Sequence, residues 1–176
     1  MRARKIFVVA IILFLCLNLI GCVAPIQKPI AYRVEVYFSP VGHVRDHITD
    51  AIDNSRTSID IAIFDFTSQE IKASLEKVKE KGGKIRIIAD SKQYKGSHSV
   101  IQSLIDSGFD VKITHGKGRG IMHNKFAILD TILLFAGSYN WTDNAKHFNY
   151  ENAVFISEAE VIKQYQKEFD KIWSST

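Results

Sequence analysis

Short segments with the two-residue period of β-strands alternate along this chain with segments at helical spacing. Apolar and polar residues alternate in RVEVYF at 33–38, whereas Ile71, Leu75 and Val78 repeat along one helix face. The predicted strands are 33–38, 58–64, 84–89, 111–114, 123–129, 132–136 and 152–156, and the predicted helices are 44–52, 68–78, 100–105 and 161–173. This alternation predicts an α/β fold in which one domain, residues 33–176, contains a mixed β-sheet flanked by helices on both faces.

The distribution of cysteine excludes two kinds of chemistry. Cys16 and Cys22 both lie near the N-terminus, and residues 23–176 contain no cysteine. The predicted domain therefore has no disulfide and no thiol for zinc binding or nucleophilic catalysis. Since 46% of the residues are hydrophobic and 24% are charged, the composition is that of a globular domain stabilised by its core.

The first 22 residues have the pattern of an export signal. Arg2, Arg4 and Lys5 precede an apolar run at 6–20 that is interrupted only by Asn18. This run is short for a membrane-spanning helix and is typical of a signal peptide. Its end, LIGC at 19–22, resembles the bacterial lipoprotein processing box, with Cys22 as the lipidated residue. We therefore expect a membrane-anchored protein of the cell envelope or periplasm, with residues 23–32 as a tether. A soluble secreted form and an uncleaved anchor are the alternatives.

Positive charge in the predicted domain is local rather than global. Residues 22–176 contain 20 basic and 19 acidic residues, so the net charge does not indicate a nucleic-acid partner. Residues 111–129, however, include no acid, and HGKGRG at 115–120 is rich in glycine. A basic rim of this kind attracts polyanions, although a flexible surface loop has a similar composition. The candidate substrate-binding residues are Lys112, His115, Lys117 and Arg119.

The polar residues with the clearest chemical pattern lie at 123–140. His123 and Lys125 are two residues apart on a predicted strand, so they point to the same side. Ser138 and Asn140 follow the next predicted strand and emerge at the same end of the sheet. An imidazole, an ammonium, a hydroxyl and an amide in one cleft provide what phosphodiester cleavage needs, because fixed donors stabilise charge that develops on phosphoryl oxygens.

This pattern, HxKxxxxD at 123–130 followed by GSxN at 137–140, resembles the signature of the phospholipase D superfamily. With its single motif, the chain looks most like the small bacterial Nuc-like endonucleases of that superfamily. Further similar stretches are VYFSP at 36–40, IDIAIFDFTS at 59–68, KIRIIAD at 84–90 and ENAVFI at 151–156.

The resemblance implies a role for each matching residue. His123 would be the nucleophile that forms a phosphohistidine, Lys125 and Asn140 would bind phosphoryl oxygens, and Ser138 would assist through its hydroxyl. Glu151 would hydrogen-bond the imidazole and set its tautomer. Asp130 completes the motif, but its strand parity is opposite to that of His123, which favours a turn and pairing role over direct catalysis.

The single motif also has consequences for assembly and cofactors. Most members of the superfamily carry two motifs, and the second histidine protonates the leaving oxygen. A homodimer with two copies of His123 face to face would supply that acid. Because the sequence has no HExxH motif and because Lys125 supplies a cation, we expect metal-independent chemistry without a cofactor.

These observations favour a non-specific endonuclease that hydrolyses DNA or RNA. The alternatives are a phospholipase D or phosphatidyl transferase that acts on lipid headgroups, and a catalytically silent nucleic-acid-binding protein. A lipid enzyme usually has an apolar surface near its site, whereas residues 112–125 are basic and rich in glycine. A silent protein does not require the catalytic positions, which are all present here.

Overall fold

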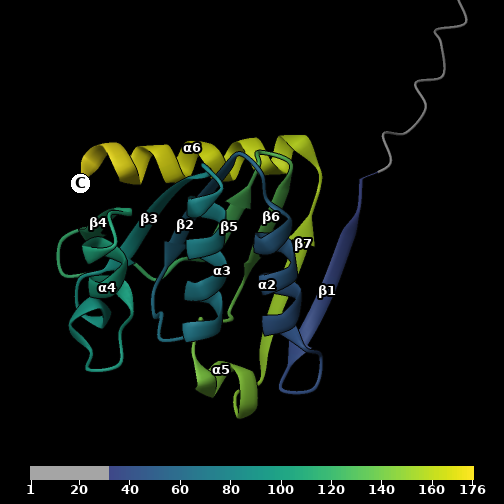
Figure 1. Ribbon diagram of the computed structural model, residues 1–176, viewed down its shortest axis with the longest axis horizontal. Coiled ribbons are helices and arrows are strands. Elements are labelled where there is room, and N and C mark those ends of the chain that lie inside the picture. Colours follow the sequence, from purple (N-terminus) through teal and green to yellow (C-terminus); the bar gives the residue numbers. More distant parts are fainter. Residues whose placement is uncertain (1–31) are drawn as a thin grey trace, which may run out of the picture. The chain divides into compact units, whose positions relative to one another are not determined.

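The computed structural model describes residues 32–176. The expected signal peptide, the lipidation at Cys22 and nearly all of the expected tether lie outside the described residues. The described residues form one unit around a seven-stranded sheet with the order β1-β7-β6-β5-β2-β3-β4 (Figure 1). The strands are β1 (Val34–Ser39), β2 (Ser58–Ile63), β3 (Lys84–Asp90), β4 (Asp110–Thr114), β5 (Lys125–Leu129), β6 (Leu133–Gly137) and β7 (Glu151–Ile156).

The sheet is mixed, as the sequence predicts. Strands β2, β3 and β4 run parallel to one another, and the connections between them contain helices. Strand β5 pairs antiparallel to β2, and β6, β7 and β1 continue the sheet as antiparallel neighbours. Pairing is parallel up to β2 and antiparallel from β5 onward. The C-terminal ends of β2, β6 and β1 therefore lie at the same edge of the sheet as the N-terminal ends of β5 and β7.

Helices cover both faces of the sheet, as predicted. The helices are α2 (Val44–Asn54), α3 (Gln69–Glu80), α4 (Ile101–Asp106), α5 (Asp143–His147) and α6 (Ala159–Ser175), with a short 3-10 helix at Gln93–Lys95. Buried residues of α2, α3 and α4 pack with Ile61 and Ala127 in one core cluster. Ile162 and Phe169 of α6 pack with Phe126 and Ile128 in a second cluster, on the opposite face. Figure 1 shows α2 and α3 side by side and α6 running across the strands. Among residues 32–176, no helix is both long enough and apolar enough to span a membrane.

One edge of the sheet collects the segments that the sequence singles out. At this edge Ile63 pairs with Lys125, Gly137 pairs with Ala153, and Ser39 pairs with Glu151. Helix α5, which follows β6, leaves from the same edge, at the bottom of Figure 1. We call it the site edge.

The structure corrects two sequence predictions. The predicted strand at 123–129 begins only at Lys125, because β2, its neighbour in the sheet, ends at Ile63, the residue that pairs with Lys125. His123 therefore lies in the loop that leads into β5. Helix α5 was not predicted, since five residues are too few for a helical period to be visible. Its N-cap is Thr142, whose hydroxyl accepts a hydrogen bond from Ala145 N.

Candidate active site

Lys125 is a buried cation at the start of β5. Its side chain belongs to a residue that is only 8% exposed, and Nζ donates a 2.8 Å hydrogen bond to the His123 backbone oxygen. Nζ also lies 4.9 Å from the ring centroid of Phe64. Burial lowers the pKa of the Lys125 ammonium, and the negative charges of Glu151 and Asp65 oppose this effect. An ammonium has three N–H donors, and among residues 32–176 Lys125 Nζ uses one of them, for the His123 backbone oxygen. The remaining donors favour the binding of an anion.

His123 is exposed on the loop beside this lysine. Its ring packs edge-on against Phe64, with 4.4 Å between the ring centroids. The preceding residue is held by Asp90, a fully buried carboxylate at the end of β3 that accepts a 3.0 Å hydrogen bond from Met122 N. The imidazole is therefore accessible to solvent, while its backbone is fixed from β3 and its ring from Phe64.

Ser138 and Glu151 form a polar pair at the same edge. The Ser138 hydroxyl donates to Glu151 Oε2, and it accepts from the Asn152 backbone N at 3.1 Å. The other oxygen of Glu151 accepts a 3.1 Å hydrogen bond from Asn149 Nδ2. In the part of the chain that the structure describes, no hydrogen bond joins Glu151 to His123, the pair that the family resemblance connects.

Asn140 is oriented by its two neighbours. Tyr139 and Trp141 are both fully buried, so the alternation along this segment directs Ser138 and Asn140 away from the core. The Trp141 backbone is tied to the end of β2, because its N donates to Asp65 O at 3.0 Å and its O accepts from the backbone N of Ser68 at 2.9 Å. Asn140 Oδ1 is buried and has no hydrogen-bond partner among residues 32–176. This oxygen therefore has an unused capacity to accept a hydrogen bond.

Asp130 lies away from this group, at the other end of β5. Five strand residues separate it from the loop of His123, about 16 Å at the usual rise of a strand. Its carboxylate accepts hydrogen bonds of 2.7–2.9 Å from the backbone N of Arg56, Thr57 and Ser58 and from the Thr57 hydroxyl. Partial burial opposes ionisation, but these donors hold the pKa of Asp130 below its usual value. In this geometry Asp130 joins the β5–β6 turn to the start of β2.

The basic segment contributes to a pocket of about 590 Å³ that opens beside His123. We call it the His123 pocket. His115 and Lys117 of the glycine-rich loop line it, together with Asn124. Helix α6 adds Lys171 and Glu168, which form a 3.0 Å ion pair. These two residues are absent from the sequence prediction, because no local pattern indicates that the end of α6 reaches the loop.

The other two predicted substrate-binding residues lie elsewhere. The Lys112 ammonium donates to the Trp173 backbone oxygen near the end of α6 and lies 5.0 Å from the Trp173 ring centroid. This is a favourable position for a cation, since the last carbonyl groups of a helix carry partial negative charge. Arg119 is exposed in the glycine-rich loop and is not among the residues that line the His123 pocket.

Two further residues of this region, Phe64 and Asp65, were not singled out as site residues from the sequence. Phe64 contacts both Lys125 and His123, and Asp65 follows it at the end of β2. Asp65 also lines a polar pocket of about 730 Å³ with Thr67, Thr142 and Asp143. The only available signal was the stretch IDIAIFDFTS, in which a charged residue directly follows a buried strand.

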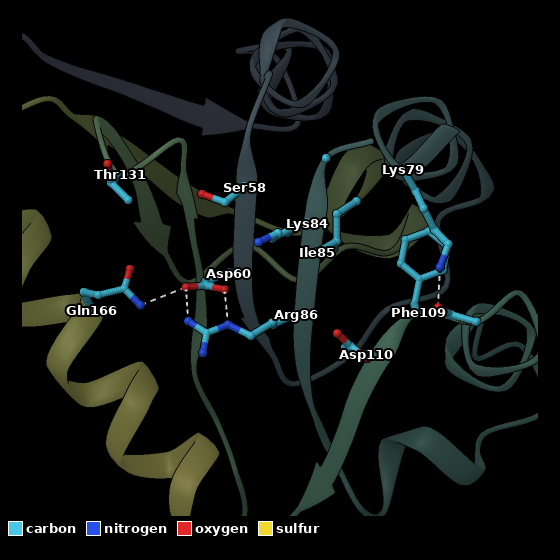
Figure 2. Close-up of a pocket in the computed structure, with 12 residues that line it drawn as sticks. Ser58, Asp60, Lys79, Lys84, Ile85, Arg86, Phe109, Asp110, Thr131 and Gln166 are labelled. Atoms are coloured by element: carbon cyan, nitrogen blue, oxygen red, sulfur yellow. Dashed lines mark hydrogen bonds and ion pairs between the residues drawn. The ribbon is translucent and has the colours of Figure 1, made fainter. Parts of the chain in front are cut away.

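A separate cavity of about 490 Å³ lies at the opposite edge of the sheet, and Figure 2 shows its lining. Asp60 and Arg86 form a bidentate ion pair there, with N–O distances of 2.7 and 2.6 Å. Gln166 of α6 donates to the same carboxylate at 2.8 Å (Figure 2). Because these groups satisfy one another, we regard the cluster as structural: it fastens α6 to the sheet. Among residues 32–176, no group of three or more His, Cys, Asp or Glu side chains is arranged to hold a metal ion.

The family model and the curated relatives that match this chain are both named for enzymes of cardiolipin. Residues 48–173 match the family described as "Cardiolipin synthase, PLD-like domain". The chain is 35% identical to mitochondrial cardiolipin hydrolase of Chlamydomonas reinhardtii over 124 residues, which cover 70% of this chain and 55% of that protein. It is 32% identical to the mouse protein of the same name over 119 residues, which cover 68% and 53%. The chain thus spans about half the length of these two curated relatives.

Solved structures with the same fold are closer in size. NucT from Helicobacter pylori superimposes with a TM-score of 0.76 and 28% identity, over 82% of this chain and 98% of that one. Nuc from Salmonella typhimurium, described as a phospholipase D family member, has a TM-score of 0.75 and 28% identity, over 82% and 95%.

Proposed function

The chain belongs to the phospholipase D superfamily of phosphodiesterases, and we propose that it is an endonuclease that hydrolyses DNA or RNA with little sequence preference. The observation that carries this substrate choice is the His123 pocket. Two histidines, including His123 itself, and Lys117 line it, and Arg119 extends from the same loop. Positive charge next to a nucleophile favours a polyanionic substrate.

In the proposed reaction, a ring nitrogen of His123 attacks phosphorus and one P–O bond breaks, which leaves a phosphohistidine. Water then attacks the phosphorus and releases the histidine. Lys125 Nζ and Asn140 Nδ2 donate to the phosphoryl oxygens. Ser138, fixed by Glu151 and Asn152, offers a hydroxyl at the same edge. The leaving oxygen takes its proton from the His123 of a second copy of the chain.

The site edge supports this dimer. Four large hydrophobic residues beside the site are more than 60% exposed: Phe38, Val41, Phe148 and Tyr150. Phe38 precedes Ser39, which pairs with Glu151, and Tyr150 precedes Glu151 in the chain. Exposed apolar groups in one region favour a protein interface. We call Phe38, Val41, Phe148 and Tyr150 the apolar rim. An isologous dimer formed through the apolar rim would cover these side chains and bring two copies of His123 together.

Hydrolysis of a phospholipid is the second candidate. The curated relatives cited above are named cardiolipin hydrolases, and an apolar rim next to the site also suits a lipid surface. We place this candidate second because the residues that line the His123 pocket include charged and imidazole groups from two elements. A catalytically silent nucleic-acid-binding protein comes third, since the proposed catalytic side chains are all present.

The full chain, assayed with EDTA against single-stranded DNA, duplex DNA, RNA and cardiolipin vesicles, tests this proposal. We expect cleavage of nucleic acid and none of cardiolipin. His123→Ala is expected to reduce turnover to background without lowering the melting temperature, because the imidazole is exposed. Cleavage of cardiolipin alone would reassign the substrate, and activity of His123→Ala within tenfold of wild type would remove His123 from the mechanism.

The N-terminal segment carries a further part of the proposal. We propose that residues 1–22 direct export and that Cys22 receives the lipid, so that the enzyme acts in the cell envelope. A palmitate label that is incorporated by wild type and lost in Cys22→Ser supports this, and a label retained by that variant contradicts it.

A further inference from the structure

A buried arginine, Arg45, connects helix α2 to the segment that follows Asn140. Arg45 is 3% exposed, and its helix is fixed through Val44 and Ile48 in the core cluster that α2 shares with α3 and α4. Its Nη2 donates a 2.7 Å hydrogen bond to the backbone oxygen of Thr142, which lies 97 residues further along the chain. The guanidinium therefore reaches from a well-packed helix to a residue two positions beyond Asn140.

The same guanidinium binds two carboxylates. Its Nη2 forms a 2.7 Å ion pair with Asp143 Oδ1, and its Nη1 donates a 3.2 Å hydrogen bond to Glu70 Oε2. Glu70 belongs to α3 and also pairs with Lys146 of α5 at 3.1 Å. Because the donors of a guanidinium have a fixed planar arrangement, three partners together define one geometry. Arg45 thus ties the start of α5 to both α2 and α3.

Thr142 passes this restraint on to Asn140. Thr142 N donates a 2.9 Å hydrogen bond to Asn140 O, while Thr142 O accepts from Lys146 N at 3.2 Å as well as from Arg45. Trp141, between the two residues, is fully buried. Asn140 Oδ1 accepts no hydrogen bond within residues 32–176, so it does not fix the amide. The direction of the Asn140 amide consequently depends on the position of its backbone.

We propose that Arg45 is a positioning residue, which sets the direction of the Asn140 amide by holding the Thr142 carbonyl against α2. The inference rests on the proposed function, in which Asn140 Nδ2 donates to a phosphoryl oxygen. Donors stabilise developing charge best when they are aimed in advance, and a displacement of about 1 Å can cost on the order of a hundredfold in rate. In this role Arg45 acts through the backbone and does not itself bind the phosphodiester.

The conservative variant Arg45→Lys tests this role in the full chain. Lysine keeps the positive charge but has a single nitrogen, so it cannot reproduce the three contacts of the planar guanidinium. With bis(p-nitrophenyl) phosphate as a generic phosphodiester, we expect kcat to fall about tenfold and KM to stay within about twofold of wild type. This split is expected because the contact that weakens is one made in the transition state.

A double-mutant cycle with Asn140→Ala separates positioning from a loss of stability. Where the amide is already absent, Arg45→Lys should slow the enzyme by less than about twofold. A purely structural role would lower the folded fraction, and hence kcat, by the same factor in both backgrounds. Arg86→Lys is the matched control, because Arg86 also pairs with two carboxylates, those of Asp60 and Asp170, in the cluster at the opposite edge (Figure 2). Its kcat should match that of its parent in each background.

A second variant leaves the buried arginine in place. Asp143→Asn removes the charge of one partner whose side chain is 76% exposed, so the fold should tolerate it even where it does not tolerate Arg45→Lys. We expect a smaller loss of kcat in the same direction, which also disappears in the Asn140→Ala background.

The direction of the amide can be followed without turnover. The ¹H–¹⁵N NMR signal of the Asn140 side chain, assigned by its absence in Asn140→Ala, should move in Arg45→Lys and in Asp143→Asn and should coincide with wild type in Arg86→Lys. An unmoved signal in the first two variants, or equal losses of kcat in both backgrounds, overturns the role of Arg45. An active His123→Ala enzyme would instead overturn the proposed function.

Discussion

At the scale of single residues, the motif contains two side chains for which we propose a role in catalysis, His123 and Lys125, and one, Asp130, whose hydrogen bonds join two elements of the fold. Lys125 is buried and His123 is exposed at the site edge, whereas Asp130 lies at the far end of the same strand. The three residues are read as one motif in the sequence because a five-residue strand joins them. Among residues 32–176, the Asp130 carboxylate has hydrogen-bond partners only at residues 56–58.

Asp130→Ala is therefore expected to act mainly on stability. The variant leaves backbone N–H groups of Thr57 and Ser58 without their acceptor, which costs about 2 kcal/mol. Because the folded-state pKa of Asp130 lies below its usual value, its contribution is complete above the unfolded-state pKa and is lost as the pH falls through the folded-state pKa. Urea unfolding at neutral and acidic pH should show a difference from wild type that shrinks in acid. An equal difference at both values contradicts the ionic role.

At the scale of elements, β6 depends on a residue without a side chain. Gly137 is the last residue of β6 and pairs with Ala153 directly before Ser138. A Cβ at this position would overlap the backbone oxygen of Asn152, which also accepts the hydrogen bond from Ser138 N. The close approach of β6 and β7 is what places the Ser138 hydroxyl next to Glu151.

Gly137→Ala should therefore lower both the stability of the fold and the turnover of the enzyme. Strand separation at this point costs roughly 1–3 kcal/mol, typical of overpacking, and displaces Ser138 from Glu151. Gly96→Ala is the control, because that glycine lies in an exposed loop with φ −63° and its added Cβ meets a single atom at 3.1 Å. Melting temperature and turnover should both fall in the first variant and remain near wild type in the second. Full turnover in Gly137→Ala would show that the close approach is dispensable.

At the scale of the whole molecule, the exposed apolar rim is the feature that a single copy leaves unexplained. Tyr150 is 94% exposed and directly precedes Glu151, and Phe148, three residues before Glu151, is 75% exposed. If this rim forms the dimer, a charge placed there should separate the two copies and abolish activity at once, because each copy then lacks the second histidine.

Phe148→Asp combined with Tyr150→Asp is expected to sediment as a monomer and to lose turnover. Ile132→Asp is the matched control, since that residue is 68% exposed but lies in the β5–β6 turn, away from the site edge. It should remain dimeric and active. As a second test, a mixture of His123→Ala and Lys125→Ala proteins should remain nearly inactive. An active monomer, or rescue to near the wild-type rate in the mixture, would contradict the shared site.

Charge around the His123 pocket also belongs to this scale, because the glycine-rich loop and α6 meet only in the folded chain. Lys117→Ala is expected to weaken DNA binding and to reduce the slope of log affinity against log salt by about one. Lys84→Ala, an exposed lysine at the opposite edge, should leave the slope unchanged. Fluorescence anisotropy with a labelled oligonucleotide between low and moderate salt measures both. A salt response that is flat for wild type would favour the lipid substrate.

Much of this architecture was predictable from local pattern. The alternation of strands and helices, the mixed sheet and the faces of Phe126 and Ala127 follow from side-chain period, which is a property of neighbouring residues. The family could be identified because HxKxxxxD and GSxN are short motifs that the sequence carries in full.

What the sequence alone determined was thus the kind of elements, their faces and the residues of the motif. Only the tertiary structure decided that β5 starts after His123, that Phe64 borders Lys125, that Asp130 lies at the other end of β5, and that the end of α6 reaches the glycine-rich loop. The physical reason is that period and propensity act between residues close in the chain. The site instead depends on strand register and on the mixed strand order, which bring residues 63, 125, 137 and 151 to one edge through pairings that no local pattern encodes.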